Sequence, residues 1–173
     1  MNTISYSKVF LALLVTFLPN QILADQNLIS SACDHTQYKE LCKKTLESDS
    51  ESSSATSFDV LSKVALNHAT STATEIHDQV TTLLKGSSSN KVALTDCDKN
   101  YQDAIERLAE SSKALASKKY FDVYTWVSSA MSSSDTCDQG FKEVGEGKSP
   151  LGDKVTTFTQ LCSIVIDITN QLK

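Results

Sequence analysis

Apolar residues recur at alternating steps of three and four along almost the whole chain past residue 55. This spacing places them on one face of an α-helix, so it predicts amphipathic helices whose apolar stripes face a common core. The second stripe takes in Ser112 and the third takes in Ser134. The stripes run over four segments, residues 58–83, 97–115, 120–144 and 151–172. Helices of roughly 22 to 28 residues with short connections favour an all-α fold, an antiparallel up-down four-helix bundle.

Glycine and proline mark where these helices are expected to stop and start. Gly86 and the polar residues after it end the first stripe, as a C′ glycine and a loop would. Gly145 and Gly147 end the third stripe in the same way. Pro150 is expected in the first turn of the last helix, where its missing N–H costs no hydrogen bond.

Residues 25–54 have a different character. A short apolar patch around Leu28 is followed by Cys33, Cys42 and Leu46, and then by the polar run SDSESSSATS. Two cysteines this close in sequence favour a small helical hairpin tied by a local disulfide. The polar run is expected to be a linker into the bundle.

The first 24 residues have the features of a secretory signal peptide. Lys8 supplies a positive charge, Val9–Leu18 is mostly apolar, and Pro19 and Ala24 follow it. An apolar run of this length is too short to span a bilayer, which needs about 20 residues. We therefore expect a secreted protein that is not attached to a membrane once the signal peptide has been cleaved. The expected organisation is a signal peptide, a hairpin with linker and a bundle domain, at residues 1–24, 25–54 and 55–173.

Composition and charge exclude several functions. The full chain has 16 basic and 21 acidic side chains, and the signal segment removes one lysine, which leaves 15 − 21 = −6. An acidic chain is a poor binder of nucleic acid. Only five Gly and two Pro argue against β-barrels and Gly-rich nucleotide loops. The three histidines are scattered and no C-x-x-C is present, so we expect no metal and no cofactor. No sequence motif of a hydrolase or nucleotide-binding enzyme is found, so an enzyme is not expected.

The spacing of the cysteines predicts their pairing. Cys97 lies 20 residues before Ser117 and Cys137 lies 19 residues after Lys118, where the turn between the second and third helices is expected. At about 1.5 Å per residue both lie near 30 Å from the turn, at one height on neighbouring helices. We therefore predict disulfides Cys97–Cys137 and, locally, Cys33–Cys42. Cys162, on the apolar stripe of the last helix, is predicted to be a buried free thiol.

Four sequence motifs, in order, resemble those of the plant invertase and pectin methylesterase inhibitor family. The first is Cys33-x-x-Thr36-x-Tyr38-x-x-x-Cys42. The others are Ala93–Cys97 with Tyr101–Ala104, Trp126–Ala130 with Asp135–Phe141, and Leu161–Ile164 with Ile168–Leu172. The resemblance covers essentially the whole mature chain. It implies a four-helix bundle behind an N-terminal hairpin, and pairing of the first cysteine with the second and the third with the fourth.

The resemblance also implies a function. The expected protein is a secreted inhibitor in the apoplast or cell wall, rather than the vacuole, that docks 1:1 on pectin methylesterase. The alternative target is an acid invertase of the cell wall or vacuole. Some invertase inhibitors carry Pro-Lys-Phe before the third helix, where this chain has Lys118-Lys119-Tyr120 and lacks the proline. A more remote alternative is a non-inhibitory bundle that is structural or carries a ligand, but aromatic stripe residues predict a filled core.

The start of the third helix is the predicted contact with the target. Charged, aromatic and hydroxyl side chains that suit a protein interface gather there. The candidates are Lys118, Lys119, Tyr120, Asp122, Tyr124, Thr125 and Trp126. Tyr120 also falls on the core stripe, so packing is an equal alternative for it. Trp126 is expected to be largely buried at an edge of the bundle, with docking as the alternative role.

Overall fold

The computed structural model of the 173-residue chain describes residues 27–86, 90–143 and 149–172. The predicted signal peptide at 1–24 and the predicted helix end at Gly145 and Gly147 lie outside the described residues. The described part of the chain is helical and contains no strand. Within it, no helix is long and apolar enough to cross a membrane.

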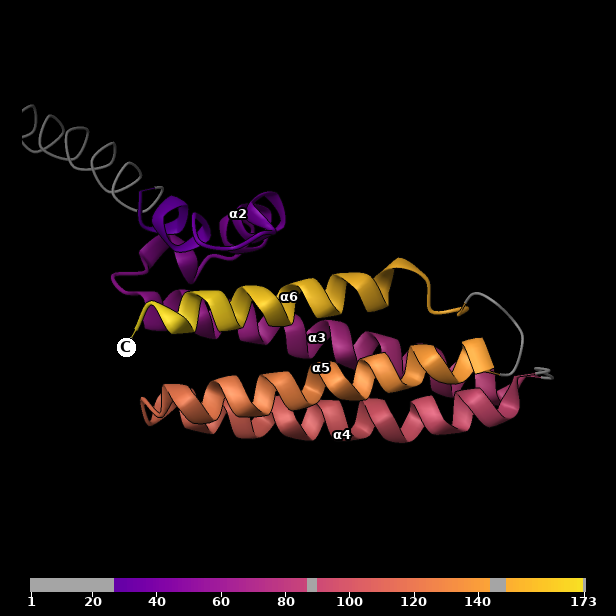
Figure 1. Ribbon diagram of the computed structural model, residues 1–173. Helices are drawn as coiled ribbons and strands as arrows, with labels where there is room; N and C mark the ends of the chain where they lie inside the picture. The colour runs from indigo at the N-terminus through magenta and orange to yellow at the C-terminus, as the bar shows by residue number, and fades with distance from the viewer. Residues whose placement is uncertain (1–26, 87–89, 144–148, 173) are drawn as a thin grey trace, which may run out of the picture.

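Four long helices form an antiparallel bundle (Figure 1). The helices are α3 (Phe58–Lys85), α4 (Lys91–Ala116), α5 (Tyr120–Glu143) and α6 (Asp153–Asn170). Each helix packs against two neighbours, so that α4 contacts α3 and α5, and α6 contacts α3 and α5. The predicted four-helix bundle is therefore confirmed.

The last helix is shorter than the sequence pattern predicts. It has 18 residues and begins at Asp153, so Pro150 lies in the turn before the helix and not in its first turn. Gly152 explains the later start, because its φ of 59° is left-handed backbone that interrupts a right-handed helix. Leu151 is buried beside this turn and anchors it to the core.

The predicted end of the first helix at Gly86 is confirmed, because α3 ends at Lys85, and two details of the stripes differ from the prediction. Gly86 follows the last residue of α3, but its φ of −84° and ψ of 173° are extended, so it is not a left-handed C′ glycine. On α4 the buried hydroxyl residue is Ser111, whereas Ser112 is exposed. A helical stripe can advance by three or by four residues, and with serine at both positions the sequence does not distinguish them.

Aromatic side chains fill the centre of the bundle. Tyr101, Phe141 and Phe158 are fully buried, and the rings of Tyr101 and Phe158 meet edge to face with centroids 6.0 Å apart. The Tyr101 hydroxyl and the Ser134 hydroxyl are 2.9 Å apart and satisfy each other in the core. Burial raises the pKa of Tyr101 to about 12, so this phenol stays neutral. A large ligand therefore has no room at this level of the bundle.

Both predicted disulfides are present. Cys97–Cys137 joins α4 to α5 with Cα atoms 4.6 Å apart, and Cys33–Cys42 closes the N-terminal hairpin. Cys162 is free and buried on α6, as predicted. Burial raises the pKa of its thiol well above the usual range, so the reactive thiolate is not formed at physiological pH.

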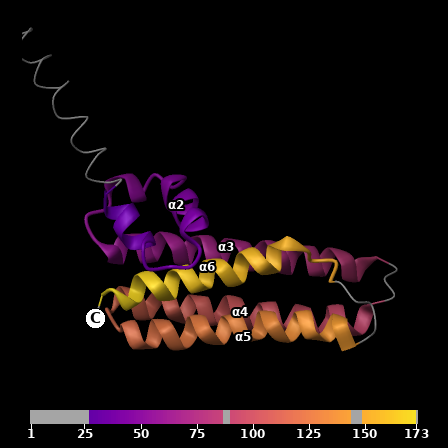
Figure 2. The ribbon, with the colours of Figure 1, turned by 45° about the horizontal axis from the view of Figure 1, so that its top comes forward.

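The N-terminal hairpin consists of a short helix at residues 27–33 and α2 (Lys39–Glu47), followed by the 3₁₀ turn η1 (Ser52–Ser54). It packs on α3 and α6, on the side away from α4 and α5 (Figure 2). Leu46 of α2 is fully buried in this contact. The Gln171 side-chain amide donates to the Ala32 carbonyl over 3.0 Å and ties the end of α6 to the hairpin.

Asp167 lies where α6 contacts the N-terminal hairpin, and it makes the stability of the protein depend on pH. Burial raises the pKa of Asp167, and a hydrogen bond from Thr36 partly opposes that shift. The pKa of Asp167 is higher in the folded protein than in the unfolded chain. The contribution of this carboxyl to stability is therefore fully present below the pKa of the unfolded chain, and it is lost as the pH rises through the pKa of the folded protein. The protonated form is therefore the one that suits the docked hairpin.

We predict that Asp167→Asn stabilises the protein at neutral pH. Asparagine keeps the shape and an acceptor for Thr36 without the charge, so the free energy of unfolding at pH 7 should rise modestly, because Asp167 is partly exposed to solvent. Below about pH 3.5 the two proteins should unfold alike. Urea denaturation at both pH values measures this. Asp103→Asn, at an exposed position of α4, is the control, and equal stability of Asp167→Asn and the parent at pH 7 would contradict the prediction.

Candidate protein-docking surface

A tight turn fixes where α5 begins. Lys118 has a left-handed φ of 55°, and the backbone N–H groups of Lys118 and Lys119 donate to the carbonyls of Leu115 and Ala114 over 2.9 Å each. α5 therefore starts directly after the last turn of α4. Cys97–Cys137 joins the same two helices toward their other end, so the helix pair is fixed at two widely separated points.

Tyr120 holds the start of α5 against the bundle. Its side chain is half-buried, and its hydroxyl donates to Asp59 Oδ1 of α3 over 2.9 Å. This hydrogen bond to the carboxylate is the main cause that raises the pKa of Tyr120. Of the two roles considered for Tyr120, the structure places it in packing.

Four of the predicted contact residues are exposed. They are Lys118, Lys119, Tyr124 and Thr125. Neither lysine makes an ion pair within the described residues. The Thr125 hydroxyl donates to the carbonyl of Phe121 over 3.0 Å, so its hydrogen is already used in a bond within α5. Asp122 is half-buried.

Trp126 faces the seam between α4 and α5. It is half-buried, and the Arg107 guanidinium carbon lies 5.4 Å from the centre of its ring. A guanidinium at this distance is attracted to the ring face and supports the contact between the two helices. Trp126 therefore lies at an edge of the bundle as expected, but it is half-buried and not largely buried.

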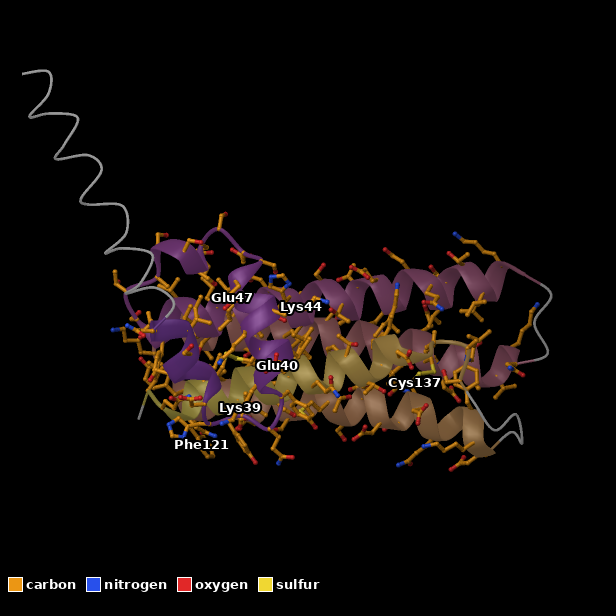
Figure 3. The ribbon with its side chains drawn as sticks, turned by 90° about the horizontal axis from the view of Figure 1, so that it is seen from above. Lys39, Glu40, Lys44, Glu47, Phe121 and Cys137 are labelled. Atoms are coloured by element: carbon orange, nitrogen blue, oxygen red, sulfur yellow. A yellow bond between two sulfur atoms is a disulfide. The ribbon has the colours of Figure 1, made fainter. Side chains whose placement is uncertain are left out.

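Phe121 is the most exposed large apolar residue of the described chain, with 73 % of its surface accessible, and it is not among the contact residues predicted from the sequence. It lies at the end of the bundle where α5 begins, far along the helix from Cys137 (Figure 3). The sequence signal for Phe121 is that it is apolar but lies off the core stripe, one position after the stripe residue Tyr120. An exposed phenylalanine is unfavourable in water, so this position suits a contact with another molecule.

Within the described residues, no group of three His, Cys, Asp or Glu side chains is placed to hold a metal ion. His77 of α3 instead meets Asp98 of α4 over 3.0 Å and links two helices.

Comparison with known proteins supports a specific kind of contact. The model of the family described as plant invertase/pectin methylesterase inhibitor matches residues 27–168. The chain is 30% identical over 171 residues to Pectinesterase inhibitor 9 of Arabidopsis thaliana, covering 88% of this chain and 83% of that protein. It is 28% identical over 153 residues to a pectinesterase inhibitor of Actinidia deliciosa, covering 87% and 82%.

A third relative is named for a different target enzyme, and solved structures share the fold. A Platanus orientalis protein provisionally named as an invertase inhibitor is 30% identical over 135 residues, covering 77% of this chain and 79% of that protein. The crystal structure of a mutant form of an Arabidopsis pectin methylesterase inhibitor superposes with a TM-score of 0.71 at 27% identity. That superposition covers 84% of this chain and 97% of the other.

Proposed function

The chain belongs to the plant invertase/pectin methylesterase inhibitor family, and we propose from this that it inhibits a pectinesterase by docking on it as one inhibitor per enzyme molecule. The observation that carries the proposal is the family match, which spans both the hairpin and the bundle. Family members are inhibitors, and relatives from two plants are named for pectinesterase.

The α4–α5 pair is proposed as the docking element. Its turn and its disulfide hold the two helices in one arrangement before binding, so little conformational entropy is lost on docking. The contacts are proposed to come from Lys118, Lys119, Tyr124 and Thr125 at the start of α5, with Tyr120 and Trp126 supporting them from within the bundle. Asp122 completes the polar rim of this region.

Inhibition of an acid invertase is the second candidate. The Platanus orientalis relative favours it. Tyr120 disfavours it, because the aromatic residue that follows Lys118 and Lys119 turns toward Asp59 and is not free to enter a partner.

The setting proposed for this activity is the cell wall. The signal peptide at 1–24 would direct the chain out of the cell, and the oxidising exterior maintains both disulfides. Cleavage would leave the hairpin and linker at 25–54 and the bundle at 55–173 as the mature protein.

Titration of the purified mature protein against one pectin methylesterase and one acid invertase, near pH 5, tests the proposal. We expect loss of pectin methylesterase activity with an end point at one inhibitor per enzyme and no loss of invertase activity. The protein alone should release no methanol from pectin and no glucose from sucrose. Failure to inhibit the pectin methylesterase would contradict the proposal, and loss of invertase activity alone would establish the alternative.

A further inference from the structure

A second stripe of residues runs along α5 beside its core stripe. Its members follow one another at steps of three and four, and each lies one position after a buried or half-buried core residue. We call this stripe the outer ridge. It consists of Phe121, Tyr124, Ser128, Met131, Asp135 and Asp138. Asp135 and Asp138 line a groove together with residues of α6, so this end of the outer ridge lies at the seam between α5 and α6, two helices that are neighbours in the bundle (Figure 1).

The outer ridge carries three large apolar side chains, with the polar Ser128 between Tyr124 and Met131. Phe121 is 73 % exposed and Tyr124 is 45 % exposed, and Met131 is half-buried. The described residues expose three large hydrophobic side chains in total, so two of the three lie on this ridge and only Val92 lies elsewhere. Aromatic residues concentrated in one patch are typical of the centre of a protein interface.

The second half of the outer ridge is acidic and borders a groove. Asp135 and Asp138 line a groove of about 260 Å³ together with polar residues of α6, among them Thr159 and Gln160, and with Tyr38 beside α2. Asp138 is paired with Lys142 over 2.7 Å. Asp135 is exposed and makes no ion pair within the described residues. A groove of this size with an unpaired carboxylate at its edge suits one lysine or arginine side chain.

The two halves are a fixed distance apart. Phe121 and Asp135 are separated by 14 residues of one continuous helix, which corresponds to about 21 Å. The Cys97–Cys137 disulfide attaches the acidic half of this helix to α4. A partner must therefore match both halves at once, which makes the spacing a determinant of specificity.

We propose that the outer ridge is the surface that recognises the pectinesterase, with an apolar pocket of the enzyme over Phe121 and a basic enzyme side chain beside Asp135. This inference rests on the proposed function and adds the chemistry of the partner. Phe121 supplies affinity by leaving water, and Asp135 supplies charge complementarity that also accelerates association. The net charge of the mature chain has the sign that favours a basic partner.

Inhibition constants and association rates of surface variants against the pectin methylesterase test this proposal. Phe121→Ala should weaken inhibition by about 30-fold, as for a hot-spot residue. Asp135→Lys should weaken it by about tenfold or more, and Asp135→Asn should reduce the dependence of the association rate on salt. Val92→Ala and Asp103→Asn are matched controls, because they change an exposed apolar and an exposed acidic residue of α4. Both controls should stay within about twofold of the parent.

The outcomes separate this inference from the proposed function. A parent protein that does not inhibit the enzyme contradicts both. A parent that inhibits while Phe121→Ala and Asp135→Lys stay within threefold contradicts the outer ridge alone. Equal losses in the ridge variants and in the controls also contradict it. Circular dichroism verifies the fold, and Phe121→Gln replaces Phe121→Ala if helicity falls.

Discussion

Replacing both Cys97 and Cys137 by alanine is expected to lower the free energy of unfolding by about 4 kcal/mol. The disulfide has a sequence separation of 40, and a closed loop of that length removes much conformational freedom from the unfolded chain. Both sulfur atoms are buried between α4 and α5, so the substitution also removes packing. For a domain of this size the midpoint of thermal unfolding should fall by about 10 °C.

Urea denaturation of the parent and of the double variant, followed by circular dichroism, measures this effect. The pair Cys33→Ala/Cys42→Ala is the control, because its shorter loop, with a sequence separation of 9, should cost only about 2.7 kcal/mol. A loss below 1 kcal/mol for the Cys97/Cys137 pair would show that packing alone fixes the two helices. The single variant Cys137→Ala should in addition leave a thiol at Cys97 that reacts on partial unfolding.

Phe158→Ala is expected to lower the free energy of unfolding by about 3–5 kcal/mol. Phe158 is fully buried on α6 and meets Tyr101 of α4 edge to face, so alanine leaves a cavity between helices that face each other across the bundle. The same denaturation measurement applies. Phe158→Leu, which keeps most of the volume, should lose markedly less.

Phe121→Ala provides the matched comparison, because the same substitution is made at an exposed position. It should change the free energy of unfolding by less than about 0.5 kcal/mol. The two substitutions are therefore expected to affect different properties, because Phe158 is needed for stability and Phe121 for inhibition. If Phe121→Ala lowers stability as much as Phe158→Ala does, Phe121 belongs to the folded core and not to a contact surface.

The sequence predicted the bundle well because its information is periodic. Steps of three and four repeat over each helix, and the equal distances of Cys97 and Cys137 from one turn predicted their disulfide. Local backbone features were predicted less well. The left-handed Gly152 moves the start of α6 to Asp153, and no periodic pattern contains that conformation.

The candidate site shows where sequence reasoning ends. A run of candidates at the start of α5 was predicted from residue type, but residue type does not give the direction of each side chain. Tyr120 turns toward Asp59, whereas the neighbouring Phe121 turns outward. Successive residues of a helix point about 100° apart, so a contact surface is a stripe at steps of three and four and not a run of consecutive residues. The second stripe of α5 could have been found in the sequence by that rule.

The buried thiol of Cys162 has a consequence for which disulfides are compatible with the packed bundle. A chain with five cysteines can pair them wrongly during oxidation, and any wrong pair that uses Cys162 holds α6 away from the core position that the thiol occupies. Such a chain leaves apolar surface exposed and keeps an accessible disulfide, which remains open to exchange with a free thiol. Once α6 has packed, the neutral and inaccessible thiol no longer takes part in exchange. The packed bundle therefore keeps its odd cysteine out of thiol–disulfide exchange while both disulfides stay formed.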